Sequence, residues 1–317
     1  MKKFKNKKKY INNKKNDNNK FNIVSVISMV LIVLICSSIL IFVGFSMYIY
    51  MNAPEFNTSL LYKNESSNIY DNKGDLIASI GSEKRQIVKY DELPEVLIDA
   101  IVATEDSRFF THDGVDIYRF TKAGLGYLTG TNEGGASTLT MQISKNTFTS
   151  KDAEGFKGLV RKFTDIYMSI FNIEKDYSKE EIMEFYVNSP YLGAGSYGVV
   201  TAAKTYFNKN ISNLTLVEAA MIAGMFQAPG EYDPYVNPEK TNVRKNEVID
   251  LMYRHGYITK SEMDAAKHKD VSEIIVKNNT NINKYQGFID TVVQEVIDRT
   301  GDNPYLVSMD IYSTMNA

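Results

Sequence analysis

Cysteine and histidine are scarce in this sequence, which has one cysteine and three histidines among 317 residues. The single cysteine, Cys36, excludes an intramolecular disulfide bond. No HExxH segment and no Cys/His cluster occurs, which excludes a zinc site of the usual spacings. The absence of a DxD pattern argues against a metal-dependent nucleotide-sugar transferase. The sequence therefore implies no cofactor firmly and leaves only a divalent cation open.

Charged residues are missing from residues 21–54, and residues 23–50 are almost wholly apolar. As a helix, these 28 residues would be roughly 42 Å long, which is more than the ~30 Å hydrocarbon core of a bilayer requires. A cleaved signal peptide would have an apolar stretch of only about 7–15 residues. We therefore predict a retained transmembrane anchor at residues 21–50.

The charges that are present are distributed unevenly along the chain. Residues 1–20 hold nine lysines and one acidic residue, whereas the remainder holds 27 basic and 37 acidic residues, a net charge of −10. Lysines that flank an apolar helix keep that side in the cytoplasm, so we predict a cytoplasmic tail at residues 1–20 and an extracytoplasmic body. Beside an anchor, a basic tail indicates contact with a membrane surface and not with nucleic acid. The predicted location is the cell membrane, with a single pass.

The rest of the sequence is typical of a mainly α protein. Residues 51–69 are polar and are predicted as a linker. Residues 69–88 hold DNKG between short β-prone runs, which predicts a small β-hairpin and strand only near the start of the body. Asp91 is predicted to cap the next helix, with Pro94 in its first turn. Apolar periodicity then predicts helices at residues 155–174, 178–188, 198–207, 215–226, 240–254 and 260–268.

Residues 117–130 (IYRFTKAGLGYLTG) are aromatic and apolar and include two basic residues. They allow two interpretations. One is a helix of the hydrophobic core. The other is a helix apposed to the membrane, because the predicted anchor holds the body beside the bilayer. The sequence alone leaves both open.

GAGSYG at residues 193–198 satisfies the GxGxxG pattern of dinucleotide sites, and Glu218 follows twenty residues later. That fingerprint requires a preceding strand in a βαβ unit, yet residues 178–188 are predicted as a helix. We therefore interpret the segment as a turn between two helices.

Two polar blocks carry the strongest indication of chemistry. EDSRFFTHDGVD (105–116) places the carboxylate of Glu105 beside a polar cluster of Asp106, Arg108 and His112. GGASTLTMQISKN (134–146) provides small hydroxyl residues, an amide and a lysine in a turn-to-helix setting. A base beside an anion-binding segment suits a reaction with a hydroxyl nucleophile and a phosphate leaving group.

Both blocks resemble signature motifs of the peptidoglycan glycosyltransferase domain, the lysozyme-like transglycosylase of class A penicillin-binding proteins. The resemblance continues in the family's order through residues 161–174, 184–207 and 214–234, and it implies a mainly α, lysozyme-like domain at roughly 70–265 behind one transmembrane helix. Residues 266–317 resemble a linker that leads to a transpeptidase domain, but the SxxK and KTG patterns of such a domain are absent. We expect either a truncated bifunctional protein, which the abrupt ending favours, or a form that ends after the glycosyltransferase.

The resemblance implies that lipid II is polymerised into glycan strands. The 4-hydroxyl of an acceptor attacks the anomeric carbon of the growing chain, and polyprenyl pyrophosphate leaves with inversion. A hydroxyl is a poor nucleophile at neutral pH, so a general base is required, and the motif maps this role onto Glu105. Burial against Phe109 and Phe110 would raise the pKa of Glu105 towards the working pH. Asp165 maps onto the second catalytic acid, although the family usually has the longer glutamate there.

The resemblance also implies a set of substrate-binding residues. Lys145, Arg161 and Lys162 fall where the family binds lipid phosphates, and Met141 replaces a usual glutamine. Taken alone, Arg161 could instead form a helix-surface pair with Asp165, worth only ~0.3–0.5 kcal/mol. His112 is interpreted as a hydrogen-bonded structural residue. The complete predicted substrate-binding set is Asp106, Ser137, Thr138, Gln142, Lys145, Asn146, Arg161 and Lys162.

Two other interpretations remain beside the glycosyltransferase. The departures at Asp165 and Met141 suggest a non-catalytic, membrane-anchored scaffold that binds lipid-linked glycan. A lysozyme-like hydrolase that cuts glycan is the other. The implied partners are lipid II and the growing glycan strand, the membrane and possible cell-wall synthesis proteins, with no nucleic acid.

Overall fold

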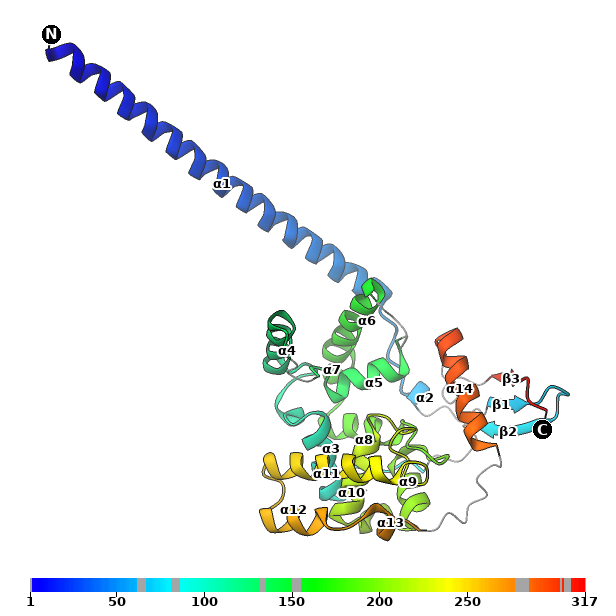
Figure 1. The fold of residues 1–317 in the computed structure, drawn as a ribbon. Helices are drawn as coiled ribbons and strands as arrows, with labels where there is room; N and C mark the ends of the chain where they lie inside the picture. Colours follow the sequence, from blue (N-terminus) through cyan, green and yellow to red (C-terminus); the bar gives the residue numbers. More distant parts are fainter. Residues whose placement is uncertain are drawn as a thin grey trace. The chain divides into compact units, whose positions relative to one another are not determined.

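The computed structural model describes residues 2–61, 67–80, 86–131, 135–149, 155–276, 285–302, 304 and 309–316. The chain divides into two compact units, Met1–Ala53 and Pro54–Ala317. Helix α1 (Lys2–Asn52) forms the first unit (Figure 1). Within α1, Ile23–Asn52 has a mean hydropathy of 3.1 in its most apolar stretch, and none of that stretch is buried. Among the described residues it is the one helix whose length and composition suffice to cross a membrane.

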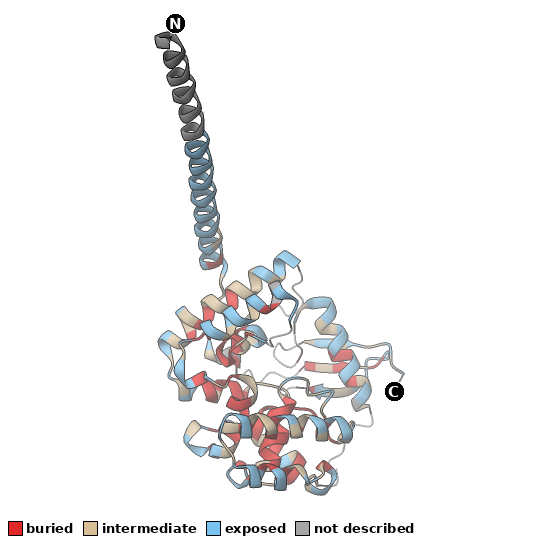
Figure 2. Cartoon of the chain, turned by 60° about the vertical axis from the view of Figure 1, so that its left-hand side comes forward, coloured by how far each residue is buried: buried red, intermediate tan, exposed pale blue. Residues whose placement is uncertain are grey.

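The core of the second unit is built around α10 (Leu216–Met225), whose residues after Leu216 are all buried. A helix that is apolar on nearly all sides must be enclosed in this way. Glu218 is the charged exception, and its carboxylate accepts a hydrogen bond from Lys209 Nζ at 2.8 Å. The helices packed around α10 are α3 (Glu95–Glu105), α9 (Gly198–Phe207), α11 (Pro238–Arg254) and α12 (Lys260–Lys267) (Figures 1 and 2).

Several helix ends follow from local sequence. The predicted helix at 198–207 coincides with α9, and the one at 178–188 with α8 (Lys179–Asn188). The prediction for Asp91 is wrong, because Asp91 lies in η1 (Tyr90–Glu92) and Pro94 is the N-cap of α3. Capping boxes, which satisfy free N–H groups at a helix start, join Ser178 to Glu181, Thr215 to Glu218 and Thr259 to Glu262.

A further group of helices lies before α8 in the chain. Helix α5 (Leu139–Thr147) packs against α6 (Gly155–Met168). The segment predicted as one helix at 155–174 is helical throughout. A π-helical turn, η3 (Ser169–Ile173), interrupts its α-helical pattern between α6 and α7 (Glu174–Asp176). The Ser169 hydroxyl donates to the Asp165 carbonyl at 2.7 Å beside this turn. Local competition of this kind for a helix carbonyl accompanies such irregular turns.

Helix α4 (Ile117–Thr129) corrects one interpretation of the sequence. Ile117 is 76% exposed and Leu125 is 58% exposed, so the core-helix interpretation of residues 117–130 is wrong. The segment nevertheless forms a helix with a capped start, since the Asp116 carboxylate accepts a hydrogen bond from the Arg119 backbone N–H. The membrane-apposed interpretation stays a prediction.

The predicted hairpin is present as β1 (Ser67–Tyr70) and β2 (Leu76–Ile80), which pair antiparallel. In the DNKG turn, one oxygen of Asp71 accepts backbone N–H groups from Lys73 at 2.8 Å and Asp75 at 2.9 Å. Strand is not confined to the start of the body, however. β3 (Asp310–Tyr312) pairs in parallel with β1, which gives the order β2-β1-β3. Helix α14 (Gln286–Thr300) contributes Ile289 and Val293 to the apolar cluster of this sheet (Figure 1).

The segments predicted as linkers are also packed in part. Leu61 of α2 (Thr58–Leu61) is fully buried in the main core, and Phe56 contacts the ring of Phe148 at 5.1 Å between centroids. Beyond residue 265, Val271 is fully buried in the same core. Leu61 and Val271 thus belong to the main core although they lie outside the predicted domain at 70–265. The remaining short elements are η2 (Phe109–Thr111), η4 (Ile211–Asn213) and α13 (Val271–Ile274).

Candidate active site

Glu105 is the last residue of α3, where a helix anchored in the core reaches a polar region. Its Oε2 accepts a hydrogen bond from Gln142 Nε2 at 2.9 Å. Burial raises the pKa of Glu105, and the Gln142 hydrogen bond and the charges of Arg244 and Arg119 oppose that rise. A carboxyl group in this environment is a stronger proton acceptor than an exposed glutamate.

The aromatic neighbours expected around Glu105 differ in their exposure. Phe109 is fully buried, whereas Phe110 is 45% exposed. Their rings meet edge to face, with centroids 5.0 Å apart. Phe109 is therefore a core residue, while Phe110 faces solvent in part.

Asp106 and Thr138 hold the site together from beneath. Asp106 is fully buried, accepts the Leu139 backbone N–H at 3.1 Å and lies 3.0 Å from His112 Nε2. Thr138 is the N-cap of α5; its hydroxyl accepts from the Met141 N–H and donates to the Gly114 carbonyl at 2.6 Å. The hydrogen bond of His112 agrees with its predicted structural role. Asp106 and Thr138 are both buried. Their contacts connect α3, η2 and α5.

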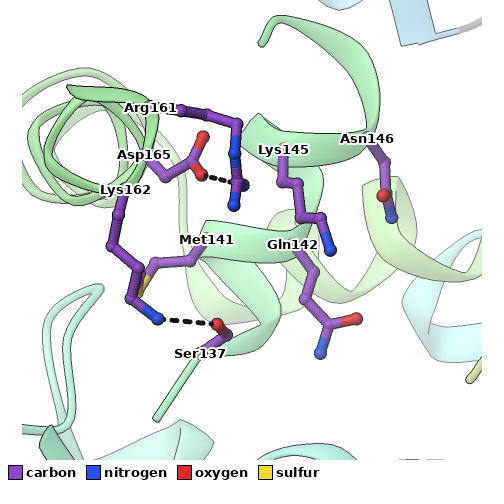
Figure 3. A pocket seen from close by; sticks show the side chains of 8 residues that line it. All are labelled: Ser137, Met141, Gln142, Lys145, Asn146, Arg161, Lys162 and Asp165. Carbon is purple, nitrogen blue, oxygen red and sulfur yellow. Dashed lines mark hydrogen bonds and ion pairs between the residues drawn. The ribbon is translucent and has the colours of Figure 1, made fainter. Parts of the chain in front are cut away.

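A cavity of about 150 Å³ opens between α5 and α6, and we call it the α5–α6 cavity. Figure 3 shows the side chains of Lys145, Arg161, Lys162 and Gln142 directed towards a common space. Three cations on two adjacent helices create a region of positive charge in a body that is acidic overall. Its lining residues are Ser137, Met141, Gln142, Lys145, Asn146, Arg161, Lys162 and Asp165.

Asp165 is a buried junction between the two helices. Its Oδ1 accepts hydrogen bonds from Ser144 and Thr149, each at 2.9 Å, and its Oδ2 lies 3.0 Å from Arg161 Nη1 (Figure 3). Burial raises the pKa of Asp165, and the two hydroxyl hydrogen bonds oppose that rise. The ion pair that the sequence allowed between Arg161 and Asp165 is present, but the side chains are only 20% and 3% exposed, so it is not a helix-surface pair. Asp165 fixes the direction of Arg161.

Lys162 reaches the opposite wall of the α5–α6 cavity. Its Nζ donates to Ser137 Oγ at 3.3 Å (Figure 3). Burial lowers the pKa of Lys162, and the neighbouring charge of Arg161 lowers it further. A bound anion would oppose both effects, because it would supply negative charge that stabilises the ammonium group. We therefore expect this lysine to favour a bound anionic group.

A second cavity, of about 500 Å³, is lined in part by residues of α3 and α4, and we call it the α3–α4 cavity. Arg119 Nη1 donates to the Glu105 carbonyl at 3.0 Å, and Nη2 donates to the Gly135 carbonyl at 2.9 Å. Of the basic residues in this cavity, the sequence interpretation singled out Arg108 but assigned no role to Arg119, Lys122 or Arg254, although the first two of these lie in the stretch at 117–130. The cavity is lined by Ala103, Thr104, Ser107, Arg108, Tyr118, Arg119, Lys122, Gly135, Leu251, Arg254 and His255.

Glu105 thus contacts one lining residue of each of the two cation-lined cavities. Gln142 carries its contact into the α5–α6 cavity, and Arg119 connects its backbone to the α3–α4 cavity. Within the part of the chain that the structure describes, no group of three or more His, Cys, Asp or Glu side chains is placed to hold a metal ion. The arrangement brings together one buried carboxyl group and two cavities lined by cationic side chains.

Comparison with known proteins places this arrangement in a family. A family model described as Transglycosylase matches residues 73–253. Penicillin-binding protein 1A of Streptococcus oralis is 36% identical over 286 residues, which cover 89% of this chain and 44% of that protein. Penicillin-binding protein 1A/1B of Bacillus subtilis (strain 168) is 37% identical over 272 residues, which cover 84% of this chain and 29% of that protein.

A solved structure, the 2.6 Å crystal structure of Penicillin-Binding Protein 1A from Haemophilus influenzae, matches 78% of this chain and 26% of its own at 26% identity, with a TM-score of 0.39. The chain spans less than half the length of the relatives it matches. The family model covers more than half of the chain. The chain therefore belongs to the transglycosylase family, as a peptidoglycan glycosyltransferase domain of class A penicillin-binding proteins.

Proposed function

We propose that this chain is a membrane-anchored enzyme that polymerises lipid II into glycan strands and releases polyprenyl pyrophosphate. The observation that carries the proposal is that Glu105 contacts a lining residue of each cation-lined cavity, Gln142 through its carboxyl group and Arg119 through its backbone carbonyl. Donor and acceptor in such a polymerisation each carry a lipid pyrophosphate. Two anion-binding regions and one base between them are what this reaction requires.

In the proposed step, Glu105 accepts the proton of the acceptor's 4-hydroxyl. The hydroxyl oxygen forms a bond to the anomeric carbon of the donor, while the bond from that carbon to the pyrophosphate oxygen breaks. The electron pair leaves with the pyrophosphate, whose growing charge is stabilised by Lys145, Arg161 and Lys162 in the α5–α6 cavity. The acceptor's own pyrophosphate occupies the α3–α4 cavity, where Arg119 lies beside Glu105.

Asp165 has a positioning role in this proposal. Its two oxygens already accept three hydrogen bonds, from Ser144, Thr149 and Arg161, so it holds the Arg161 guanidinium in the α5–α6 cavity. A shorter aspartate suits this enclosed junction and need not reach the sugar. The departure from the family's usual glutamate is therefore compatible with an active enzyme.

Incubation of the purified full chain with lipid II in detergent tests the proposed function. We expect glycan polymer, detected by gel electrophoresis of labelled product, together with released polyprenyl pyrophosphate. Binding of lipid II without turnover would support the scaffold interpretation instead. Shortening of added glycan strands, without polymer formation from lipid II, would support a hydrolase.

We further propose that the anchor holds the amino terminus in the cytoplasm and the second unit outside. Cysteine labelling tests this orientation, because the one native cysteine, Cys36, can be replaced by serine. In that background, Lys260→Cys should react with a membrane-impermeant maleimide in intact cells, since Lys260 is exposed. Lys14→Cys should react only after permeabilisation. The reverse pattern would contradict the orientation.

A further inference from the structure

Behind the base lies a buried phenol that the proposed reaction does not use. Tyr186, on α8, is 3% exposed, and its ring stacks on Phe226 with centroids 4.8 Å apart and planes 9° apart. Its hydroxyl donates to Gln142 Oε1 at 3.3 Å, and Gln142 Nε2 donates to Glu105 Oε2 at 2.9 Å. One chain of contacts therefore runs from the Phe226 ring through the Tyr186 phenol and the Gln142 amide to the Glu105 carboxylate.

We propose that Tyr186 is a positioning residue that orients the Gln142 amide so that its NH₂ group, and not its carbonyl, faces Glu105. The inference rests on the proposed function, in which Glu105 acts as the base. An amide can occupy its site in two orientations that differ by a half-turn. Which orientation is favoured decides whether Glu105 receives a hydrogen bond or faces a carbonyl oxygen.

The two orientations leave different groups unsatisfied. In the observed one, the Tyr186 O–H donates to the amide carbonyl and the NH₂ group donates to the Glu105 carboxylate. In the flipped one, the NH₂ group would donate to the phenol oxygen, and the buried phenol O–H would lose its acceptor. Leaving a buried donor unpaired is costly, so the tyrosine favours the orientation that stabilises ionised Glu105.

The phenol is well suited to remain a donor. Burial raises the pKa of Tyr186 well above its ordinary value, and the charges of Glu105 and Asp106 raise it further. The phenol therefore stays protonated throughout the working pH range. The stacked Phe226 ring restricts the movement of the tyrosine ring, which keeps the phenol oxygen beside the Gln142 carbonyl.

Other charged groups also face Glu105 and must be considered. Asp106 adjoins it on the chain, Arg119 approaches from α4, and Arg244 approaches from α11. Arg244 is held in place by a hydrogen bond from its Nε to the Gly224 carbonyl at 3.3 Å. Replacing Tyr186 with phenylalanine leaves these charges unchanged. A change in the titration of Glu105 in that variant would therefore come through the amide.

The test is the pH dependence of lipid II polymerisation by the full chain and by Tyr186→Phe. The substitution keeps the ring against Phe226 and removes only the hydroxyl. Without the tyrosine hydroxyl, the Gln142 amide loses its preference for donating to Glu105. The acidic limb of the kcat profile should therefore move to higher pH by about half to one pH unit. The rate on the alkaline plateau should stay within about threefold of the parent, because ionised Glu105 can still act there.

Tyr206→Phe is the matched control. Tyr206 is also a fully buried phenol, but its hydroxyl donates to the Leu192 carbonyl at 2.9 Å. This variant should lose a comparable hydrogen bond without moving the acidic limb. A merely structural role for Tyr186 would lower the plateau of Tyr186→Phe and leave its limb where the parent has it, and that result would overturn the inference.

A second variant covers the case in which Tyr186→Phe does not fold. Gln142→Met removes the donor to Glu105 directly, so its acidic limb should move upward at least as far. If Tyr186→Phe does fold, adding it to Gln142→Met should cause no further movement, because the tyrosine acts through the amide. An unmoved limb in Gln142→Met would overturn the inference.

A measurement without turnover separates this inference from the proposed function. The carboxylate band of Glu105 can be followed by infrared difference spectroscopy of the parent against Glu105→Gln as the pH is varied. Its midpoint should rise in Tyr186→Phe even if lipid II is not the substrate. A parent without polymerase activity would contradict the proposed function, whereas an unmoved midpoint would contradict the role of Tyr186.

Discussion

Replacing Glu105 with glutamine should lower the rate of lipid II polymerisation by about 10²–10⁴-fold, the range of a lost general base. Glutamine has nearly the same shape, and it can still meet Gln142 across the 2.9 Å contact, but it cannot accept a proton at neutral pH. Lipid II binding should change little, since the cations of both cavities remain. Initial rates of polymer formation and a separate binding assay measure the two effects.

The parent enzyme should also lose activity on acidification. Burial raises the pKa of Glu105 above its ordinary value, and catalysis requires the ionised form. Activity is therefore full above that raised pKa and falls as the pH drops through it. The residual activity of Glu105→Gln should lack this acidic limb. A limb that persists unchanged would assign the titration to another group.

Glu95→Gln provides a matched control for this substitution. Glu95 lies at the start of the same helix, α3, and its side chain is exposed. The substitution removes a charge from the helix without touching the site, so polymerisation should stay within about twofold of the parent. A comparable loss of activity in both variants would mean that the effect of Glu105→Gln comes from damage to α3.

Replacing Lys162 with methionine should reduce kcat/KM for lipid II by about 10²-fold. Methionine keeps the aliphatic stem but removes the charge that faces the α5–α6 cavity and the hydrogen bond to Ser137. Because the pyrophosphate gains charge as it leaves, the loss should fall mainly on kcat. Rates measured over a range of lipid II concentrations separate kcat from KM.

Lys157→Met is the control for the loss of a lysine from α6. Lys157 lies on the same helix, is exposed and does not line the cavity. Its replacement should leave kcat/KM within about twofold of the parent. If Lys162→Met behaved like Lys157→Met, the α5–α6 cavity would not be the site of the leaving pyrophosphate.

Local sequence predicted much of this architecture because helix signals are local. Apolar spacing and N-caps such as Ser178 and Thr259 mark helix starts within a few residues. The residues of the α5–α6 cavity could be predicted for the same reason. Gln142 and Lys145 lie on successive turns of α5, and Arg161 lies on the neighbouring helix α6.

The features that the sequence did not reveal depend on contacts between distant segments. The α3–α4 cavity combines Arg119 with Arg254, which no local pattern connects. Tyr186 was visible only as part of a motif, and its contact with Gln142 joins α8 to α5. The exposure of Ile117 was also hidden, since an apolar residue on a helix gives no indication of whether another element covers it.

The central position of β1 in the sheet has a consequence for folding during synthesis. Asn68 in β1 pairs with Asp310 in β3, 242 residues further on. At a synthesis rate of about 5–20 residues per second, the ribosome needs on the order of tens of seconds to deliver that partner. Until then one side of the hairpin offers unpaired backbone groups to any neighbouring nascent strand. Slow translation or crowded polysomes should therefore favour misassembly at this sheet before the helices are affected.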